Sequence, residues 1–232
     1  MPSALINHDK FDDIPETITA FRNGEFIVVM DDPGRENEGD LIIAGDSITT
    51  EKMAFMVRHT SGLICAPITS DLTESLKLPQ MVENSEDPRG TAYTVSIDAA
   101  DPSVTTGISA HDRALTIRHL ADPNSTAASF RRPGHVFPLR ARPGGVRARR
   151  GHTEAGVDFC RLAGKPEVAA ICEIVEDGEE VAGTAVREHP GMMRGEGCIA
   201  FARRWGLKVC TIEDLVNYLE KTEGKLGANG SS

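Results

Sequence analysis

Acidic residues crowd the stretch DDPGRENEGD, at positions 31–40, directly behind the apolar run FIVVM. Carboxylates this close repel one another unless water or a cation holds them. In an extended chain, Glu36, Glu38 and Asp40 would point to one side and Arg35 to the other. Three converging carboxylates would bind a hard cation such as Mg²⁺, which prefers oxygen ligands. A solvated acidic turn is the alternative interpretation of this segment.

Arginines dominate a second segment, between Pro123 and Thr153, which contains no Asp or Glu. Arginine is favoured over lysine where a planar group must recognise phosphate or carboxylate. A solvated basic face or a subunit contact would explain most of these residues equally well. The arginines are Arg131, Arg132, Arg140, Arg142, Arg147, Arg149 and Arg150.

The end of this segment, RRGHTEA at positions 149–155, joins a predicted strand to a predicted helix through a glycine. Free N–H groups at the start of a helix can face an anion, so Arg149, Gly151 and Thr153 could together hold one phosphate. Neither the mononucleotide P-loop pattern nor a GxGxxG before a helix is present. His152 is either structural or, as a neutral imidazole, completes a metal site with one carboxylate.

A metal site and a phosphate site in one chain indicate a phosphorylated, oxygen-rich small substrate. Mg²⁺ takes few protein ligands, retains water and accepts oxygens of the substrate. A cation on a carbonyl and a neighbouring hydroxyl would stabilise an enediolate, while a carboxylate removes the adjacent proton. From the residues alone, the sequence therefore predicts metal-dependent enolisation of a sugar phosphate.

The composition is that of a globular protein and excludes several other classes. The 232 residues are 40% hydrophobic, and 25 basic against 35 acidic side chains leave a net charge of −10. That charge, with 5% aromatic residues, argues against binding to nucleic acid or to an anionic membrane. No stretch resembles a membrane span or a signal peptide. Five cysteines without CxxC spacing predict reduced thiols in the cytoplasm, not disulfides or a zinc site.

Helical and strand patterns mix along the chain without strict alternation, and no linker divides it. We expect a single α/β domain (α+β-like) over residues 1–232, a layered sandwich with a mixed β-sheet flanked by helices. Residues 1–12 and 224–232, approximately, are expected to be flexible tails. Helices are predicted over 14–24, 51–59, 109–121, 153–164 and 212–221. Strands are predicted over 25–32, 40–46, 63–68, 91–98, 135–141, 145–151, 167–176 and 207–212.

Six motifs, in order along nearly the whole chain, resemble those of 3,4-dihydroxy-2-butanone 4-phosphate synthase. They are DDPGRENEGDLI, TSGLICAP, TTGISAHDR, RRPGHVFPL, GGVRARRGHTEAGVDFCRLAG and CEIV. The resemblance implies a lyase of riboflavin biosynthesis that uses Mg²⁺, for which Mn²⁺ may substitute. It would convert D-ribulose 5-phosphate into L-3,4-dihydroxy-2-butanone 4-phosphate and formate. It also implies a homodimer whose active sites are shared between the subunits.

The same resemblance assigns expected roles to individual residues. Glu36 and His152 match the metal-binding positions, and Glu38 matches an acid or base. Substrate contacts are implied for Arg35, Glu36, Asp40, Glu173 and the phosphate-binding stretch Arg149, Arg150, Gly151, His152 and Thr153, with Thr106 assisting. His135 and Glu173 match residues essential for catalysis, and Cys65 matches an active-site position. His135 is expected to reach the active site of the other subunit.

Other interpretations remain open for several of these residues. Cys65 could be a buried core thiol, and His135 could brace the turn after Pro133 and Gly134. Glu173 stands in an apolar strand, where an unpaired carboxylate is costly, which favours a role in the site. His111 departs from the small residue of the family pattern and either adds a donor near the substrate or starts a helix.

Two other functions are compatible with the same residues. A metal-dependent isomerase or aldolase could act on a pentulose phosphate at the same two sites. A non-catalytic module could use the arginines to bind anions or RNA. The length and the absence of a zinc-type cysteine cluster predict an enzyme without a fused GTP cyclohydrolase II domain.

Overall fold

The computed structural model describes residues 10–226, so most of the two expected tails lies outside the described residues. Asp12, which we assigned to the N-terminal tail, makes several contacts with the strand Lys208–Thr211 and the helix before it. Its N–H donates to the Val209 carbonyl (2.7 Å), and its carboxylate pairs with Arg203 (2.6 Å) and Lys208 (3.0 Å).

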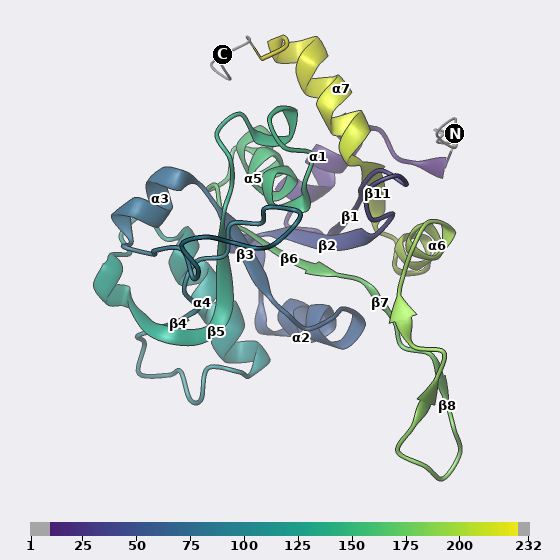
Figure 1. The fold of residues 1–232 in the computed structure, drawn as a ribbon, viewed down its shortest axis with the longest axis horizontal. Coiled ribbons are helices and arrows are strands. Elements are labelled where there is room, and N and C mark those ends of the chain that lie inside the picture. The colour runs from purple at the N-terminus through teal and green to yellow at the C-terminus, as the bar shows by residue number, and fades with distance from the viewer. Residues whose placement is uncertain (1–9, 227–232) are drawn as a thin grey trace.

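A seven-stranded mixed sheet forms the centre of the protein (Figure 1), in the order β11-β1-β2-β6-β3-β5-β4. The pairs β1–β11 and β3–β5 are parallel, and the other neighbours are antiparallel. This confirms the predicted mixed sheet. The strands are β1 (Ile27–Met30), β2 (Gly39–Ala44), β3 (Cys65–Ile68), β4 (Ile97–Ala99), β5 (Phe130–Arg140), β6 (Ala169–Glu173) and β11 (Lys208–Thr211).

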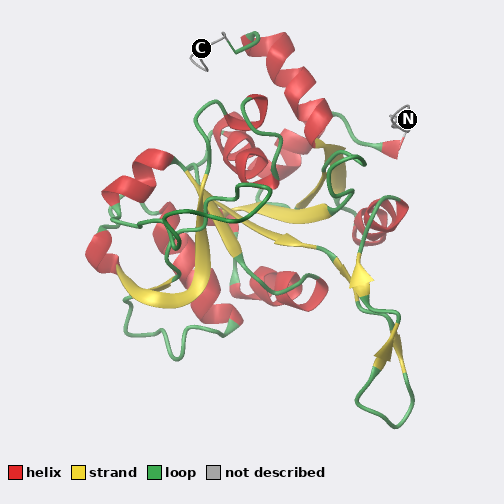
Figure 2. Ribbon diagram, viewed as in Figure 1, coloured by secondary structure: helices red, strands yellow, loops and turns green. Residues whose placement is uncertain are grey.

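Helices cover both faces of the sheet (Figure 2). Because the central strands are buried on both faces, their sequences are continuous apolar runs. One apolar cluster joins one face of the sheet to α1 (Ile14–Arg22), α5 (His152–Ala163) and α7 (Ile212–Glu223). A second joins the opposite face to α2 (Thr50–His59), α4 (Ala110–Ala121) and α6 (Glu196–Trp205). In β2, for example, Ile42 belongs to the first cluster and Leu41 to the second. Among the described residues, no helix has the length and apolar character needed to cross a bilayer.

Local signals placed the five predicted helices within a few residues, whereas the sequence analysis assigned no helix to α6. The Thr49 hydroxyl accepts a hydrogen bond from the N–H of Lys52 (3.2 Å), and that of Ser109 accepts one from Asp112 (3.0 Å). Gly164 ends α5 in the left-handed conformation (φ 69°). Short elements that the sequence analysis did not predict are α3 (Ser70–Ser75) and the 3₁₀ turns η2 (Gly45–Ser47), η3 (Ala127–Ser129) and η4 (Gly145–Arg147).

The predicted strand over 145–151 was wrong, because this segment is a turn. Gly144 and Gly145 take positive φ values of 92° and 60°, which an L-residue in a strand cannot adopt. The carboxylate of Asp158, in α5, then accepts a hydrogen bond from the Val146 N–H (2.8 Å) and holds η4 against the helix. The basic segment therefore approaches α5 as a tight turn and not as a sheet edge.

Of the predicted strand 91–98, only the last two residues form a regular strand, as part of β4 (Ile97–Ala99). Upstream, Tyr93 and Thr94 form isolated bridges with Leu139 and Gln80. The neighbouring strand β5 contains Pro133 and Pro138, which have no N–H to donate to a ladder, so continuous pairing is interrupted.

The predicted strand 167–176 divides into β6 and the start of a hairpin arm that projects from the body of the protein (Figure 1). The arm contains β7 (Val175–Glu176), β8 (Glu179–Glu180), β9 (Arg187–Glu188) and β10 (Gly191–Met192). Its pairs are two residues long, too short for an alternating pattern to be visible in the sequence.

Candidate active site

A cavity of about 220 Å³ gathers most of the residues that the sequence analysis selected. The register of β2 and β6 sets Asp40 opposite Glu173, and that of β3 and β6 sets Cys65 opposite Ile171. Because side chains alternate along a strand, Asp40, Glu173 and Cys65 share the face that α5 covers. The predicted residues that line the cavity are Arg35, Glu36, Glu38, Asp40, Cys65, Arg149, His152, Thr153 and Glu173.

The acidic segment folds as a compact turn over residues 33–36 and is not extended throughout, yet Glu36, Glu38 and Asp40 still line one cavity. The buried carboxylate of Asp31 accepts hydrogen bonds from the N–H groups of Glu36 (3.2 Å) and Glu38 (2.9 Å) and from the guanidinium of Arg35 (2.7 Å). Asn37 has a positive φ of 56°, which reverses the chain. Sequence reasoning missed Asp31, although its position at the end of the apolar run was a signal.

Arginines form ion pairs with both glutamates of this turn. The carboxylate of Glu36 pairs with Arg35 and, at 3.0 Å, with Arg89. The carboxylate of Glu38 pairs with Arg194 at 2.7 Å. The like charges of the turn are therefore balanced by cations from the turn itself, from the segment before Gly90 and from the end of the hairpin arm.

His152 is held as a neutral imidazole with one nitrogen directed at Asp40. Its Nε2 lies 3.0 Å from the Val29 carbonyl, which can only accept, so Nε2 carries the proton. Burial lowers the pKa of His152, which keeps the ring neutral and leaves a lone pair on Nδ1. That Nδ1 lies 3.3 Å from Oδ1 of Asp40, a buried oxygen with no hydrogen-bond partner.

A divalent cation fits this arrangement. Burial, together with the nearby carboxylates of Glu173 and Asp31, raises the pKa of Asp40 well above its ordinary value, and a bound cation would offset these acidic charges. Across residues 10–226, no three His, Cys, Asp or Glu side chains converge as a ready set of ligands. Glu36 and His152 both line the cavity and offer an oxygen and a nitrogen donor, so they fit a cation that keeps water in its other positions.

Glu173 and Cys65 form the wall between the sheet and the cavity. The Ser61 hydroxyl donates to the carboxylate of Glu173 (3.0 Å), which orients it toward the site. Burial and the nearby Glu173 raise the pKa of the Cys65 thiol well above its ordinary value, so it stays protonated at neutral pH. A protonated, buried thiol favours the structural interpretation of Cys65 over that of a nucleophile.

The phosphate-binding residues predicted from the sequence meet at the start of α5. Gly151 precedes the helix, and the first N–H groups of α5 point out of its end beside Arg149. The guanidinium of Arg149 pairs with the buried carboxylate of Glu154 (2.6 Å) and donates to the Thr91 hydroxyl (3.1 Å). A Cβ on Gly151 would lie 2.3 Å from Nη1 of Arg149, so a larger residue there would displace the guanidinium from the helix start.

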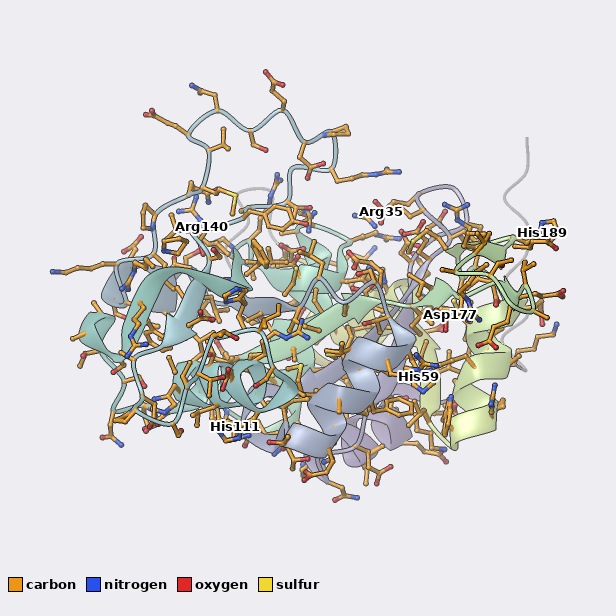
Figure 3. All side chains as sticks on the ribbon, turned by 90° about the horizontal axis from the view of Figure 1, so that it is seen from below. Arg35, His59, His111, Arg140, Asp177 and His189 are labelled. Carbon is orange, nitrogen blue, oxygen red and sulfur yellow. The ribbon has the colours of Figure 1, made fainter. Side chains whose placement is uncertain are left out.

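Four predicted site residues do not line the cavity: Thr106, His135, Arg150 and Gly151. Arg150 is half exposed and pairs with Glu213. Nδ1 of His135 lies 2.9 Å from the carboxylate of Asp98. A Cβ on Gly107, which follows Thr106, would lie 2.5 Å from the ring of His135, so Thr106 and His135 belong to one neighbourhood at the β4–β5 edge. His111 lies on the side of the molecule opposite to Arg35 (Figure 3).

A larger cavity of about 530 Å³ lies around Arg147 and contains none of the predicted residues. The carboxylate of Glu223 in α7 pairs there with Arg147 (2.9 Å) and Arg161 (2.6 Å). Because Arg147, Arg161 and Glu223 already pair with one another, size alone does not make this cavity the better candidate.

Comparison with known proteins gives the same family as the motifs. The chain matches the 3,4-dihydroxy-2-butanone 4-phosphate synthase family over residues 15–218. It is 69% identical over 232 residues to the enzyme of that name from Pyricularia oryzae, covering 100% of both chains. It is 50% identical to the one from Saccharomyces cerevisiae, covering 91% of this chain and 100% of that one.

A solved structure extends the match to three dimensions. A 3,4-dihydroxy-2-butanone 4-phosphate synthase in complex with two magnesium ions superposes with a TM-score of 0.92 and 71% identity, covering 93% of this chain and 100% of that chain. A cation-free structure of an enzyme with the same name gives a TM-score of 0.88 at 70% identity, over 92% of this chain and 100% of that one. The chain therefore belongs to the 3,4-dihydroxy-2-butanone 4-phosphate synthase family.

Proposed function

We propose that this chain is a Mg²⁺-dependent carbon–carbon lyase that converts D-ribulose 5-phosphate into L-3,4-dihydroxy-2-butanone 4-phosphate and formate. The observation that carries the proposal is the cavity of about 220 Å³, in which Glu36 and His152 lie together with Arg149 and Thr153. A cation site and an anion site thus face one space of the size of a five-carbon phosphate. The names of relatives from Aquifex aeolicus and rice, both called riboflavin biosynthesis proteins, support a role in that pathway.

Most of the predicted residues that line the cavity have a part in this reaction. Glu36 and Nδ1 of His152 would hold Mg²⁺, or Mn²⁺ in its place, and the bound ion would stabilise negative charge on substrate oxygens. Arg149, the N–H groups around Gly151 and the Thr153 hydroxyl bind the phosphoryl group. Glu38 and Glu173 exchange protons with the carbon skeleton. Arg35 and Asp40 orient the substrate, and the apolar wall at Ile171 and Leu139 excludes water.

The alternative functions explain fewer of these contacts. An isomerase or aldolase would use the same two sites but release no formate. An RNA-binding module would need the arginines on one free surface, whereas Arg147 and Arg150 pair with Glu223 and Glu213. Arg132 donates to three backbone carbonyls, of Leu76, Ala127 and Phe130. Three of the seven arginines of this segment are thus engaged within the fold.

Formate release tests the proposed function. We expect the purified protein to produce formate from D-ribulose 5-phosphate. Formate production should stop when a chelator removes divalent cations, and it should recover on addition of Mg²⁺. Formate can be measured with a coupled formate dehydrogenase assay, using ribose 5-phosphate as the control substrate. An isomerised pentulose phosphate without formate would support the isomerase instead.

We further propose that the enzyme works as a cytoplasmic homodimer in which His135 completes the active site of the partner. The separation of His135 and Thr106 from the cavity within one subunit supports this arrangement. Leu63 and Ile108, which are 40% and 51% exposed, supply apolar surface that a second copy could cover.

Mixing two inactive variants tests the shared site. Glu36→Ala and His135→Ala should each be inactive alone, because each lacks one part of every site. After the two are unfolded and refolded together, about a quarter of the wild-type activity should return, since half of the dimers are mixed and each mixed dimer has one intact site. If no activity returns while the refolded dimers form normally, His135 acts within its own subunit.

A further inference from the structure

Arg89 holds the carboxylate that the proposed function assigns to the metal. Its Nε lies 3.0 Å from Oε1 of Glu36, and its Nη2 donates to the carbonyl of Arg35 (2.8 Å). The side chain of Arg89 therefore binds both the backbone of the acidic turn and the carboxylate of Glu36. No sequence motif pointed to Arg89, because the two partners are about fifty positions apart in the chain.

The two arginines on Glu36 differ in how firmly they are held. Arg35 bonds one oxygen of Glu36 and also the buried carboxylate of Asp31, and these acids raise its pKa against the opposing effect of burial. Its side chain is 21% exposed, whereas that of Arg89 is 43% exposed. No second carboxylate pairs with Arg89 in the described part of the chain. Of the two cations on Glu36, Arg89 is thus the one that can be displaced.

Hydrogen bonds that do not involve the side chain of Arg89 hold its backbone in place. The carboxylate of Asp87 accepts hydrogen bonds from the N–H groups of Arg89 (3.1 Å) and Thr91 (2.7 Å), and Gly90 closes the turn with a φ of 65°. The carbonyl of Arg89 accepts from the guanidinium of Arg149 (3.2 Å). A substitution of the side chain therefore leaves the turn and its contact with the phosphate-binding arginine in place.

We infer that the guanidinium of Arg89 is an internal counterion that occupies Glu36 in the metal-free protein and competes with the divalent cation for it. This inference rests on the proposed role of Glu36 as a metal ligand. A carboxylate oxygen that accepts from a guanidinium must release it to give the same lone pair to a cation. The positive charge of Arg89 also repels a divalent ion across the short distance between them. Arg89 thus lowers the affinity for metal while it offsets the charge of Glu36 when no metal is bound.

Titration of the protein with Mg²⁺ in the absence of substrate, monitored by isothermal titration calorimetry, tests this competition. Arg89→Met, which keeps length and apolar stem but removes the charge, should tighten the Mg²⁺ dissociation constant about fivefold, equivalent to about 1 kcal/mol. Arg89→Lys should fall between the wild type and Arg89→Met, because a lysine keeps the charge but loses the fork geometry. Arg89 is partly exposed, so these variants should fold, and circular dichroism will verify it; Arg89→Gln replaces Arg89→Met if needed.

The matched control is Arg194→Met. Arg194 pairs with Glu38 in the same turn and carries the same charge, but it does not touch Glu36. Removing it should change the Mg²⁺ affinity by less than about twofold, the part due to long-range charge. Equal tightening in Arg194→Met and Arg89→Met, or no tightening in either, would overturn the inference.

The same titration separates this inference from the proposed function. Glu36→Gln should abolish the calorimetric signal at the proposed site. If Glu36→Gln binds Mg²⁺ as the wild type does, the ligand assignment fails and the competition fails with it. If Glu36→Gln loses binding but Arg89→Met matches the wild type, the metal site stands and only the role of Arg89 is wrong.

Discussion

Replacing Glu36 by alanine is expected to lower formate production by at least about a thousandfold while the fold remains intact. The carboxylate of Glu36 makes its side-chain contacts with Arg35 and Arg89 at the surface of the cavity and supports no apolar core. His152→Ala should have a similar effect on activity, since it removes the nitrogen that faces Asp40. Initial rates of formate release and far-ultraviolet circular dichroism give the two readouts.

The control for Glu36 is an ion-paired acidic residue that lies remote from the cavity. Glu196, at the start of α6, pairs with Lys10 on the surface, and Glu196→Ala should retain wild-type activity. His152→Ala also removes the donor to the buried Val29 carbonyl, so some loss of thermal stability is expected in that variant alone. Full activity of either Glu36→Ala or His152→Ala in metal-free buffer would refute the assignment of both as metal ligands.

Arg149→Ala is expected to lower kcat/KM by about a hundredfold, because it removes charged hydrogen bonds to the phosphoryl group in a partly buried site. Arg149 is anchored by Glu154, whose side chain is 1% exposed and which also accepts from the Arg142 N–H (3.0 Å). Arg149→Lys should recover only part of the loss, since a lysine cannot bond the carboxylate and the phosphate with a planar fork. Steady-state kinetics with D-ribulose 5-phosphate measure both effects.

Arg131→Ala serves as the comparison from the same basic segment. Arg131 is exposed on β5, outside the cavity, so its removal should change kcat/KM by less than about twofold. Equal losses for Arg131→Ala and Arg149→Ala would mean that the whole arginine segment acts as one electrostatic surface. That result would favour the anion-binding module over the lyase.

Several features of the site were readable because they depend on neighbouring residues. The start of α5 at His152 follows from the glycine before it and the helical pattern after it. The strand preference of the residues around Cys65, Asp40 and Glu173 follows from their apolar neighbours, which is why their elements were placed within a few residues. Cap residues such as Thr49 and Ser109 act within three positions of the helix that they begin.

Other local patterns misled the prediction where a distant contact decided the outcome. The alternation in 145–151 resembles a strand, but the carboxylate of Asp158 draws Val146 into a turn. The acidic segment could alternate its side chains, but Asp31 collects two of its N–H groups and folds it back. In both cases a buried carboxylate satisfies backbone donors that a sheet would otherwise satisfy.

The sequence by itself determined the family, the kinds of element and the two chemical groups, acidic and basic, that the reaction requires. Only the tertiary structure decided that Asp40 faces Glu173 across two strands, that Arg89 rests on Glu36, and that His135 stands apart from the cavity. The physical reason is the range of the forces involved. Caps, turns and periodic patterns act within one turn of helix or one strand, whereas strand register and ion pairing depend on which distant segments pack together.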